Sequence, residues 1–140
     1  MAEDTHPTQI LISIYPRYAD AIINGVKRVE FRKNGCPTSA QLIALYSTKP
    51  DSSIRALCKV DSCVVANKHT LWKRYGKVGA IPYKDFMAYF HGTTIGKCYV
   101  LGSVCKLKRP LPLKRLASVH SVPQSFAYLS KEDIRLLQRN

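Results

Sequence analysis

The sequence is short of acidic side chains. Nine Asp and Glu stand against 22 Lys and Arg in 140 residues, which gives a formal net charge of +13 at pH 7. Charge this far from zero is the electrostatic footprint of a nucleic-acid-binding protein, although a merely solvated basic face is the alternative. No acid occurs between Asp85 and Glu132, and the bases in that interval are Lys97, Lys106, Lys108, Arg109, Lys114, Arg115 and Lys131.

Long apolar runs are also missing. A membrane-spanning helix needs about 20 consecutive apolar residues, and no segment of the sequence approaches that length. The N-terminal stretch MAEDTHPTQ is acidic and polar, whereas a secretory signal begins basic and continues apolar. The basic residues occupy strand-like and loop segments rather than one face of an amphipathic helix. We therefore expect a cytoplasmic protein that does not bind membranes.

Metal and cofactor motifs are absent as well. The five cysteines are an odd set without a CxxC pair, which favours neither a disulfide framework nor a zinc knuckle. On regular strands, the odd separations of Cys58 from Cys63 and of Cys98 from Cys105 place each pair on opposite faces. HExxH, P-loop, GxGxxG and zinc-deaminase patterns do not occur. The expectation is buried structural thiols, with no metal and no cofactor.

Alternating apolar residues dominate what is present. They predict an α+β fold in a single domain over residues 10–140, preceded by a flexible N-terminal arm of residues 1–9. Helix signals include Pro16 in a first turn, Asn24-Gly25 as a stop and Ser130 as an N-cap. The predicted strands cover residues 10–15, 27–33, 41–47, 54–65 and 94–108, and the predicted helices cover 16–24, 69–79, 81–92 and 130–140.

The octapeptide GVKRVEFR, residues 25–32, places one acid among three bases. As a strand, it sets Val29 and Phe31 on an apolar face and Glu30 on the polar face with its neighbouring arginines. We expect an exposed, ionised Glu30 that orients an arginine or accepts a hydrogen bond from a base edge. An ordinary surface cluster, contributing ~0 to 1 kcal/mol per ion pair, is the alternative. The candidate site residues of this segment are Lys27, for a phosphate, with Arg28, Glu30 and Arg32.

A family resemblance rests on several segments in order: LISIYPRYADAIINGVKRVEFRK, LYSTKP, IRALCKV, the Trp72 region, FMAYF and VPQSFAYL. Together they resemble the ASCH domain family of the PUA-like superfamily, in particular its bacterial and phage members, over about residues 10–130. The most specific part is Gly25-x-Lys27-x-x-Glu30-x-Arg32. The resemblance implies a small β-barrel with flanking short helices, a cleft lined by these residues, and RNA or nucleotide binding.

Further candidates for nucleic-acid contacts lie outside the octapeptide. Arg17 and Tyr18 offer a phosphate contact and a stacking surface at the start of a helix. Trp72 with two adjacent bases has the character of a stacking site, although a sole Trp is more often part of a core. The remaining candidates are the turn after the third strand, Tyr46, Ser47, Thr48 and Lys49; the bases Lys73 and Arg74; and an electrostatic track over residues 97–115 that includes Lys106, Lys108 and Arg109.

The function favoured by these features is a non-catalytic module that binds RNA or single-stranded nucleic acid. A metal-independent ribonuclease using Lys27 and Glu30 as acid and base is one alternative. The resemblance also implies an amidohydrolase acting on modified nucleosides, which uses a Lys, a hydroxyl residue and a carboxylate. Glu30 stands where that pattern has Thr, which weakens this alternative. A basic protein-interaction adaptor is the third.

Overall fold

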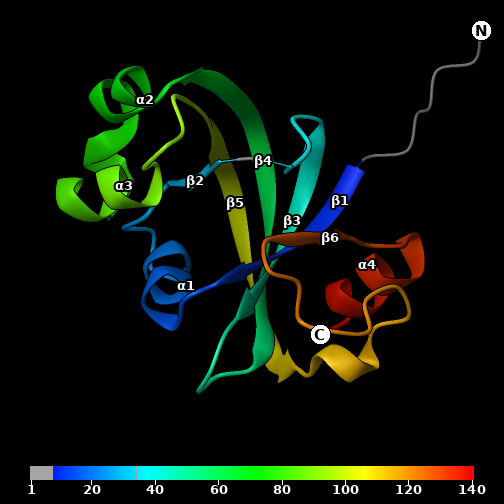
Figure 1. Ribbon diagram of the computed structural model, residues 1–140. Helices are drawn as coiled ribbons and strands as arrows, with labels where there is room; N and C mark the ends of the chain where they lie inside the picture. The colour runs from blue at the N-terminus through cyan, green and yellow to red at the C-terminus, as the bar shows by residue number, and fades with distance from the viewer. Residues whose placement is uncertain (1–7, 34) are drawn as a thin grey trace, which may run out of the picture.

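A single mixed sheet organises the computed structural model, which describes residues 8–33 and 35–140 (Figure 1). Within these residues, six strands are arranged in the order β2-β5-β4-β3-β1-β6. β1 and β3 pair in parallel, and all other neighbouring strands are antiparallel. The strands are β1 (Thr8–Ile14), β2 (Val29–Arg32), β3 (Ala40–Ser47), β4 (Ser53–Asn67), β5 (Ile95–Leu111) and β6 (Phe126–Tyr128).

Short helices flank this sheet. Pro16 begins α1, whose buried residues Ala19 and Ile22 face the sheet, and Gly25, with φ of +80°, follows its end as the sequence predicts. Ser130 caps α4 by accepting a hydrogen bond from the Asp133 amide at 3.1 Å. The helices are α1 (Pro16–Ile23), α2 (Lys68–Tyr75), α3 (Tyr83–Tyr89) and α4 (Lys131–Gln138), with 3-10 turns η1 (Gly76–Val78) and η2 (Leu113–Arg115).

The sheet is curved but open, so the α+β prediction is confirmed and the closed barrel is wrong. β2 pairs only with β5, and β6 pairs only with β1, which leaves these two strands at opposite edges of the sheet. They span four and three residues. Strands this short form few ladder hydrogen bonds, and no backbone ladder joins the two edges within the described residues.

The two faces of the sheet carry separate hydrophobic clusters. Ile10, Ile12 and Ile14 pack with the buried residues of α1 on one face. Leu11, one position along β1, packs with Leu137 of α4 on the opposite face, because neighbouring strand residues point to opposite sides. Figure 1 accordingly shows α1 and α4 flanking the sheet from opposite sides. A third cluster joins β2 and β5 to α2 and α3.

Thr8 and Gln9, the last two residues of the predicted N-terminal arm of residues 1–9, belong to the sheet. β1 begins at Thr8, and Gln9 is already buried within it. Residues 1–7 of the expected arm lie outside the described residues. No helix in the described part of the chain is long and apolar enough to cross a lipid bilayer.

The predicted separation of Cys58 and Cys63 onto opposite faces is wrong. Both cysteines contact the hydrophobic cluster that faces α1. The pairing of β4 with β5 shifts register between Cys58 and Val60 and again between Val60 and Ser62. The first shift adds an extra residue to β5, and the second adds one to β4, where the step from Val60 to Ser62 faces the single step from Leu101 to Val100. The second shift therefore breaks the two-residue alternation of β4 on which the prediction depends. All five cysteines are free thiols. Cys36, Cys58 and Cys98 are buried as expected, whereas Cys63 is half-buried and Cys105 is exposed.

Candidate functional site

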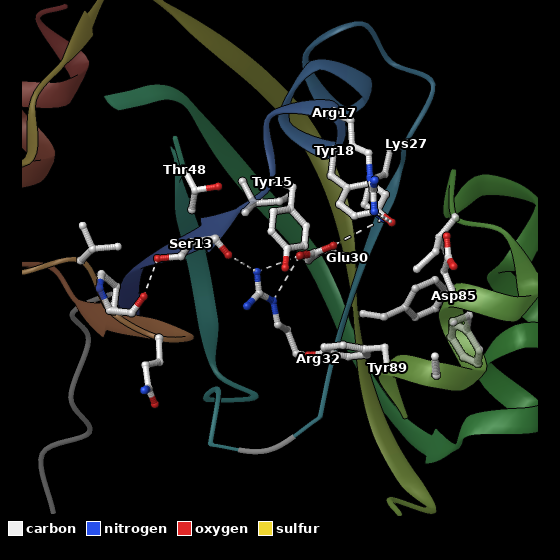
Figure 2. Close-up of a pocket in the computed structure, with 18 residues that line it drawn as sticks. Ser13, Tyr15, Arg17, Tyr18, Lys27, Glu30, Arg32, Thr48, Asp85 and Tyr89 are labelled. Carbon is white, nitrogen blue, oxygen red and sulfur yellow. Dashed lines mark hydrogen bonds and ion pairs between the residues drawn. The ribbon is translucent and has the colours of Figure 1, made fainter. Parts of the chain in front are cut away.

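A pocket of about 590 Å³ opens on the α1 side of the sheet. Its walls come from the end of β1, from α1, from β2, from α3 and from residues 122–124 (Figure 2). Segments distant in the sequence therefore meet around it. This volume lies within the range of roughly 300 to 1,000 Å³ that small-molecule sites usually have.

Glu30 lies at the centre of an ion-pair cluster in the pocket (Figure 2). Its Oε2 accepts hydrogen bonds from Arg32 Nη2 at 2.9 Å and from Arg32 Nε at 3.2 Å. Lys27 Nζ lies 3.5 Å from the other oxygen, Oε1. The structure brings together Lys27, Glu30 and Arg32, three of the candidate residues of the octapeptide. Arg28, which was expected beside Glu30, is exposed and does not line the pocket.

The predicted exposure of Glu30 is wrong, because only 7% of the residue is accessible and Arg32 is equally buried at 8%. β2 has two buried faces. Val29 and Phe31 pack into the cluster with α2 and α3, so Glu30 and Arg32 point the other way, into the concave side of the sheet. Burying an ion pair carries a desolvation cost that an exposed pair does not have. Close contacts between the charges and further hydrogen bonds must therefore offset this cost.

Lys27 lies in the pocket wall rather than at its mouth. Its ammonium donates to the carbonyl oxygen of Gly79 at 2.5 Å. It also sits 5.1 Å from the ring centre of Tyr18 and 5.7 Å from that of Phe31. With its side chain only 2% exposed, this ammonium is positioned to hold Glu30 and the η1 turn. A phosphate contact fits an accessible cation better.

Arg32 connects the two edges of the sheet through its side chain. Besides Glu30, its Nη2 donates to the carbonyl oxygen of Ser13 at 2.9 Å, and its Nη1 reaches that of Ser125 at 3.5 Å. Burial is the largest single influence on the pKa of Arg32 and acts to lower it, but the Glu30 carboxylate, Tyr89 and Cys36 together outweigh burial, and the pKa is raised above the ordinary value. The guanidinium therefore stays charged. It links the edge strand β2 to Ser13 of β1 and to Ser125, which precedes the opposite edge strand β6.

The mouth of the pocket is aromatic and carries an accessible cation. Arg17 lies 4.7 Å from the ring centre of Tyr18 and donates to its hydroxyl at 3.2 Å. Tyr15, which is 62% exposed, is beside them. Tyr89 of α3 lines the opposite wall, and burial raises the pKa of its hydroxyl, which stays protonated at neutral pH. The mouth thus offers stacking surfaces next to a free guanidinium.

Several predicted residues lie outside this pocket. Tyr46 is buried on the α4 face of the sheet, and Ser47 is buried with its hydroxyl donating to Asp51 at 2.7 Å. Trp72 packs against Phe86 and Tyr83 in the third cluster. Of the turn after β3, Thr48 lines the pocket. The other candidates outside the pocket are exposed bases: Arg28, Lys49, Lys73, Arg74, Lys106, Lys108 and Arg109.

Other pocket residues were missed from the sequence. Ser13 and Tyr15 flank the end of β1, where they read as ordinary strand residues. Asp85 and Tyr89 belong to a helix whose spacing suggested burial, and residues 122–124 lie in an irregular segment. The one sequence signal for residues 122–124 was the QSF segment, whose place in the order of the family motifs indicated that this part of the chain belongs with the octapeptide.

Within the described residues, no group of three or more His, Cys, Asp and Glu side chains is placed to hold a metal ion. The polar side chains of the pocket are instead two carboxylates, two guanidinium groups, one amine, one amide and several hydroxyls. This set can hydrogen-bond a base edge or a phosphate without a metal bridge.

Comparison with known proteins identifies the family. The ASCH domain model matches residues 12–104. A protein named ASCH domain-containing ribonuclease from Zymomonas mobilis is 31% identical over 133 residues, covering 92% of this chain and 89% of that protein. The large ribosomal subunit protein uL22 of Ureaplasma parvum is 25% identical over 128 residues, but this chain spans only 40% of its length.

Solved structures agree with this assignment. The crystal structure of ASCH from Zymomonas mobilis has a TM-score of 0.85 at 29% identity and covers 96% of each chain. A serine-to-alanine mutant of the same protein has a TM-score of 0.86 at 30% identity, covering 95% of this chain and 96% of that one. The chain belongs to the ASCH domain family.

Proposed function

We propose that the protein is an RNA-binding module whose pocket around Glu30 receives one nucleotide of a single-stranded segment. One observation carries the proposal: a buried carboxylate and guanidinium form the floor of a pocket whose mouth holds the exposed ring of Tyr15, the half-buried ring of Tyr18 and the exposed guanidinium of Arg17. Single-stranded RNA is recognised by stacking unstacked bases on such rings and by hydrogen bonds to their edges.

The residues divide into three roles. Tyr15 and Tyr18 on one side, with Tyr89 opposite, offer faces for a base. Glu30 offers Oε1, which lies 3.5 Å from the Lys27 ammonium, as an acceptor for an amino or imino group of the base. Arg17 at the mouth contacts the phosphate, the role first assigned from the sequence to Lys27 as well.

Binding of labelled trinucleotides, followed by fluorescence anisotropy, tests the proposal. Arg17 is exposed, so Arg17→Gln removes the phosphate contact without disturbing the core, and affinity is expected to fall about tenfold. Lys77→Gln removes an equal charge from the exposed η1 turn and is the matched control, with affinity unchanged. Undetectable trinucleotide binding, or equal affinity in Arg17→Gln and the parent, overturns the proposal.

Cleavage of the bound RNA is a second candidate function. It is favoured by the 31% identity over 92% of this chain to a protein named a ribonuclease. Lys27 and Glu30, 3.5 Å apart, are the groups that exchange a proton with the RNA in such a reaction. RNA that stays intact after long incubation with the parent protein removes this candidate. Cleavage by the parent that disappears in Glu30→Gln, measured at RNA concentrations that saturate both proteins, establishes it.

The same incubations address the remaining alternatives. An amidohydrolase releases an acid from a modified nucleoside, which chromatography of the nucleosides detects. A basic protein-interaction adaptor has no salt-sensitive affinity for RNA. Nucleosides recovered unchanged exclude the amidohydrolase, and salt-sensitive RNA binding excludes the adaptor. The two results together support the RNA-binding module.

A further inference from the structure

A second concave site lies on the other face of the sheet. It is a groove of about 360 Å³ between β4, β5 and the end of α4. We call it the α4 groove. Leu57, Leu107 and Leu137 line it and also belong to the hydrophobic cluster opposite α1. The sheet therefore separates this groove from the pocket around Glu30.

Four cations from three elements surround the α4 groove. Lys59 belongs to β4, Lys106 and Lys108 to β5, and Arg139 follows α4. All four are exposed, and none of the described residues that line the groove is Asp or Glu. The Lys108 amide donates to the carbonyl oxygen of Asn140 at 2.5 Å, which holds the end of α4 beside β5.

These cations differ in their pairing from the buried cations of the first pocket. Lys27 and Arg32 share the Glu30 carboxylate as an ion-pair partner, which leaves Arg17 at the mouth as the cation of that pocket without an ion pair among the described residues. Among the described residues, none of the four groove cations takes part in an ion pair. A cation without a protein partner holds small counterions, and these are released to solvent when a phosphate replaces them.

We propose that the α4 groove binds the phosphate backbone of an RNA whose single nucleotide occupies the pocket around Glu30. The inference rests on the proposed function and extends it to two contacts of different chemistry. The pocket reads one nucleotide and depends weakly on salt, while the groove holds a backbone segment and carries most of the salt dependence. A trinucleotide in the pocket does not extend to the opposite face, whereas a longer strand passes around the edge of the sheet.

The test compares a trinucleotide with an oligoribonucleotide of about 16 nucleotides. The variant is Lys106→Gln with Lys108→Gln, and the charge-matched control is Lys77→Gln with Lys84→Gln, all at exposed positions. The groove variant is expected to bind the longer RNA about tenfold more weakly, and its salt slope falls by about 1.4, since each contact to a single strand contributes about 0.7. Its affinity for the trinucleotide stays that of the parent.

The outcomes separate the two proposals. If trinucleotide binding persists but the groove variant and the control lose the same affinity for the longer RNA, the groove inference is overturned and the proposed function stands. That result would point to another occupant, such as an acidic protein segment. If the groove variant weakens trinucleotide binding equally, the two contacts are not separate. If the parent binds neither RNA, both proposals fail.

Discussion

The Arg32 guanidinium directs two nitrogens, Nε and Nη2, at the single oxygen Oε2 of Glu30, at 3.2 and 2.9 Å. This geometry leaves Oε1 facing Lys27, 3.5 Å away. One carboxylate therefore pairs with two buried cations from the same octapeptide. The arrangement gives a physical reason for the single acid in GVKRVEFR, because without it two positive charges would be buried unpaired.

Removal of that acid is expected to be costly. Glu30→Ala leaves Lys27 and Arg32 without a counter-charge, and breaking a buried pair in this way lowers the free energy of unfolding by about 3 to 5 kcal/mol. Urea denaturation measures the loss. Asp20→Ala, which removes an exposed partner of Arg55, is the matched control and costs less than about 1 kcal/mol. Equal losses in the two variants would show that burial of Glu30 has no energetic consequence.

Acid stability is expected to depend on Asp133. Burial alone would raise the pKa of this carboxyl, but hydrogen bonds from the Ser118 hydroxyl and from the Ala117 and Ser118 amides outweigh it and hold the pKa below the ordinary value of 3.8. A lowered folded-state pKa contributes stability that is complete above the unfolded value and is lost as the pH falls below it. Asp133→Asn should therefore be less stable at neutral pH.

The same variant should lose its stability more gradually below about pH 4, because the carboxyl that titrates there is gone. Thermal unfolding across pH 2 to 7 compares the two proteins. Parallel pH curves for the parent and Asp133→Asn would contradict the role of this carboxylate.

Thiol reactivity should follow burial. Burial raises the pKa of Cys58 and of Cys98 to about 12, so neither forms a thiolate at neutral pH. Cys105 is exposed. A thiol reagent at pH 7.5 should modify Cys105 rapidly in the folded protein, and Cys58 and Cys98 only after denaturation. Mass spectrometry of digested protein locates the label, and early modification of Cys58 or Cys98 would refute the prediction.

Gly79 is expected to tolerate no side chain. Its carbonyl accepts the Lys27 hydrogen bond, and a Cβ atom added there would lie 2.6 Å from the Phe31 ring. Gly79→Ala should cost about 1 to 3 kcal/mol of stability through overpacking. Because the displaced carbonyl also moves Lys27, trinucleotide affinity should fall at temperatures where the variant is still folded. A variant with parental stability and affinity would show that the η1 turn does not position the pocket.

Much of the fold could be predicted from local patterns. Strand alternation located β2 and β3, Pro16 and Gly25 bounded α1, and Ser130 located the start of α4. These signals lie within a few residues of the structures that they specify. The prediction that Cys58 and Cys63 lie on opposite faces of β4 was wrong. It assumed regular alternation along the strand, but register shifts are set by the pairing with β5 rather than by the sequence of β4 alone.

The candidate site was predicted only in part. The octapeptide identified Lys27, Glu30 and Arg32, but their burial depends on β1 and on the segment before β6, more than 90 residues away in the case of Ser125. The same long-range folding divides the basic residues. Lys106 and Lys108 border the α4 groove and Arg17 lies at the pocket, so net charge predicted a polyanionic partner without predicting two separate surfaces.

The most direct measurement of the central claim is a titration of the isotope-labelled protein with a trinucleotide, followed by the shifts of its amide NMR signals. We expect saturable changes concentrated at residues that line the pocket, with Thr48, Glu30 and Tyr89 among the largest. Residues of the α4 groove, such as Leu107 and Arg139, should remain unshifted. Saturation with changes confined to the groove, or spread evenly over exposed lysines, would contradict a nucleotide site around Glu30.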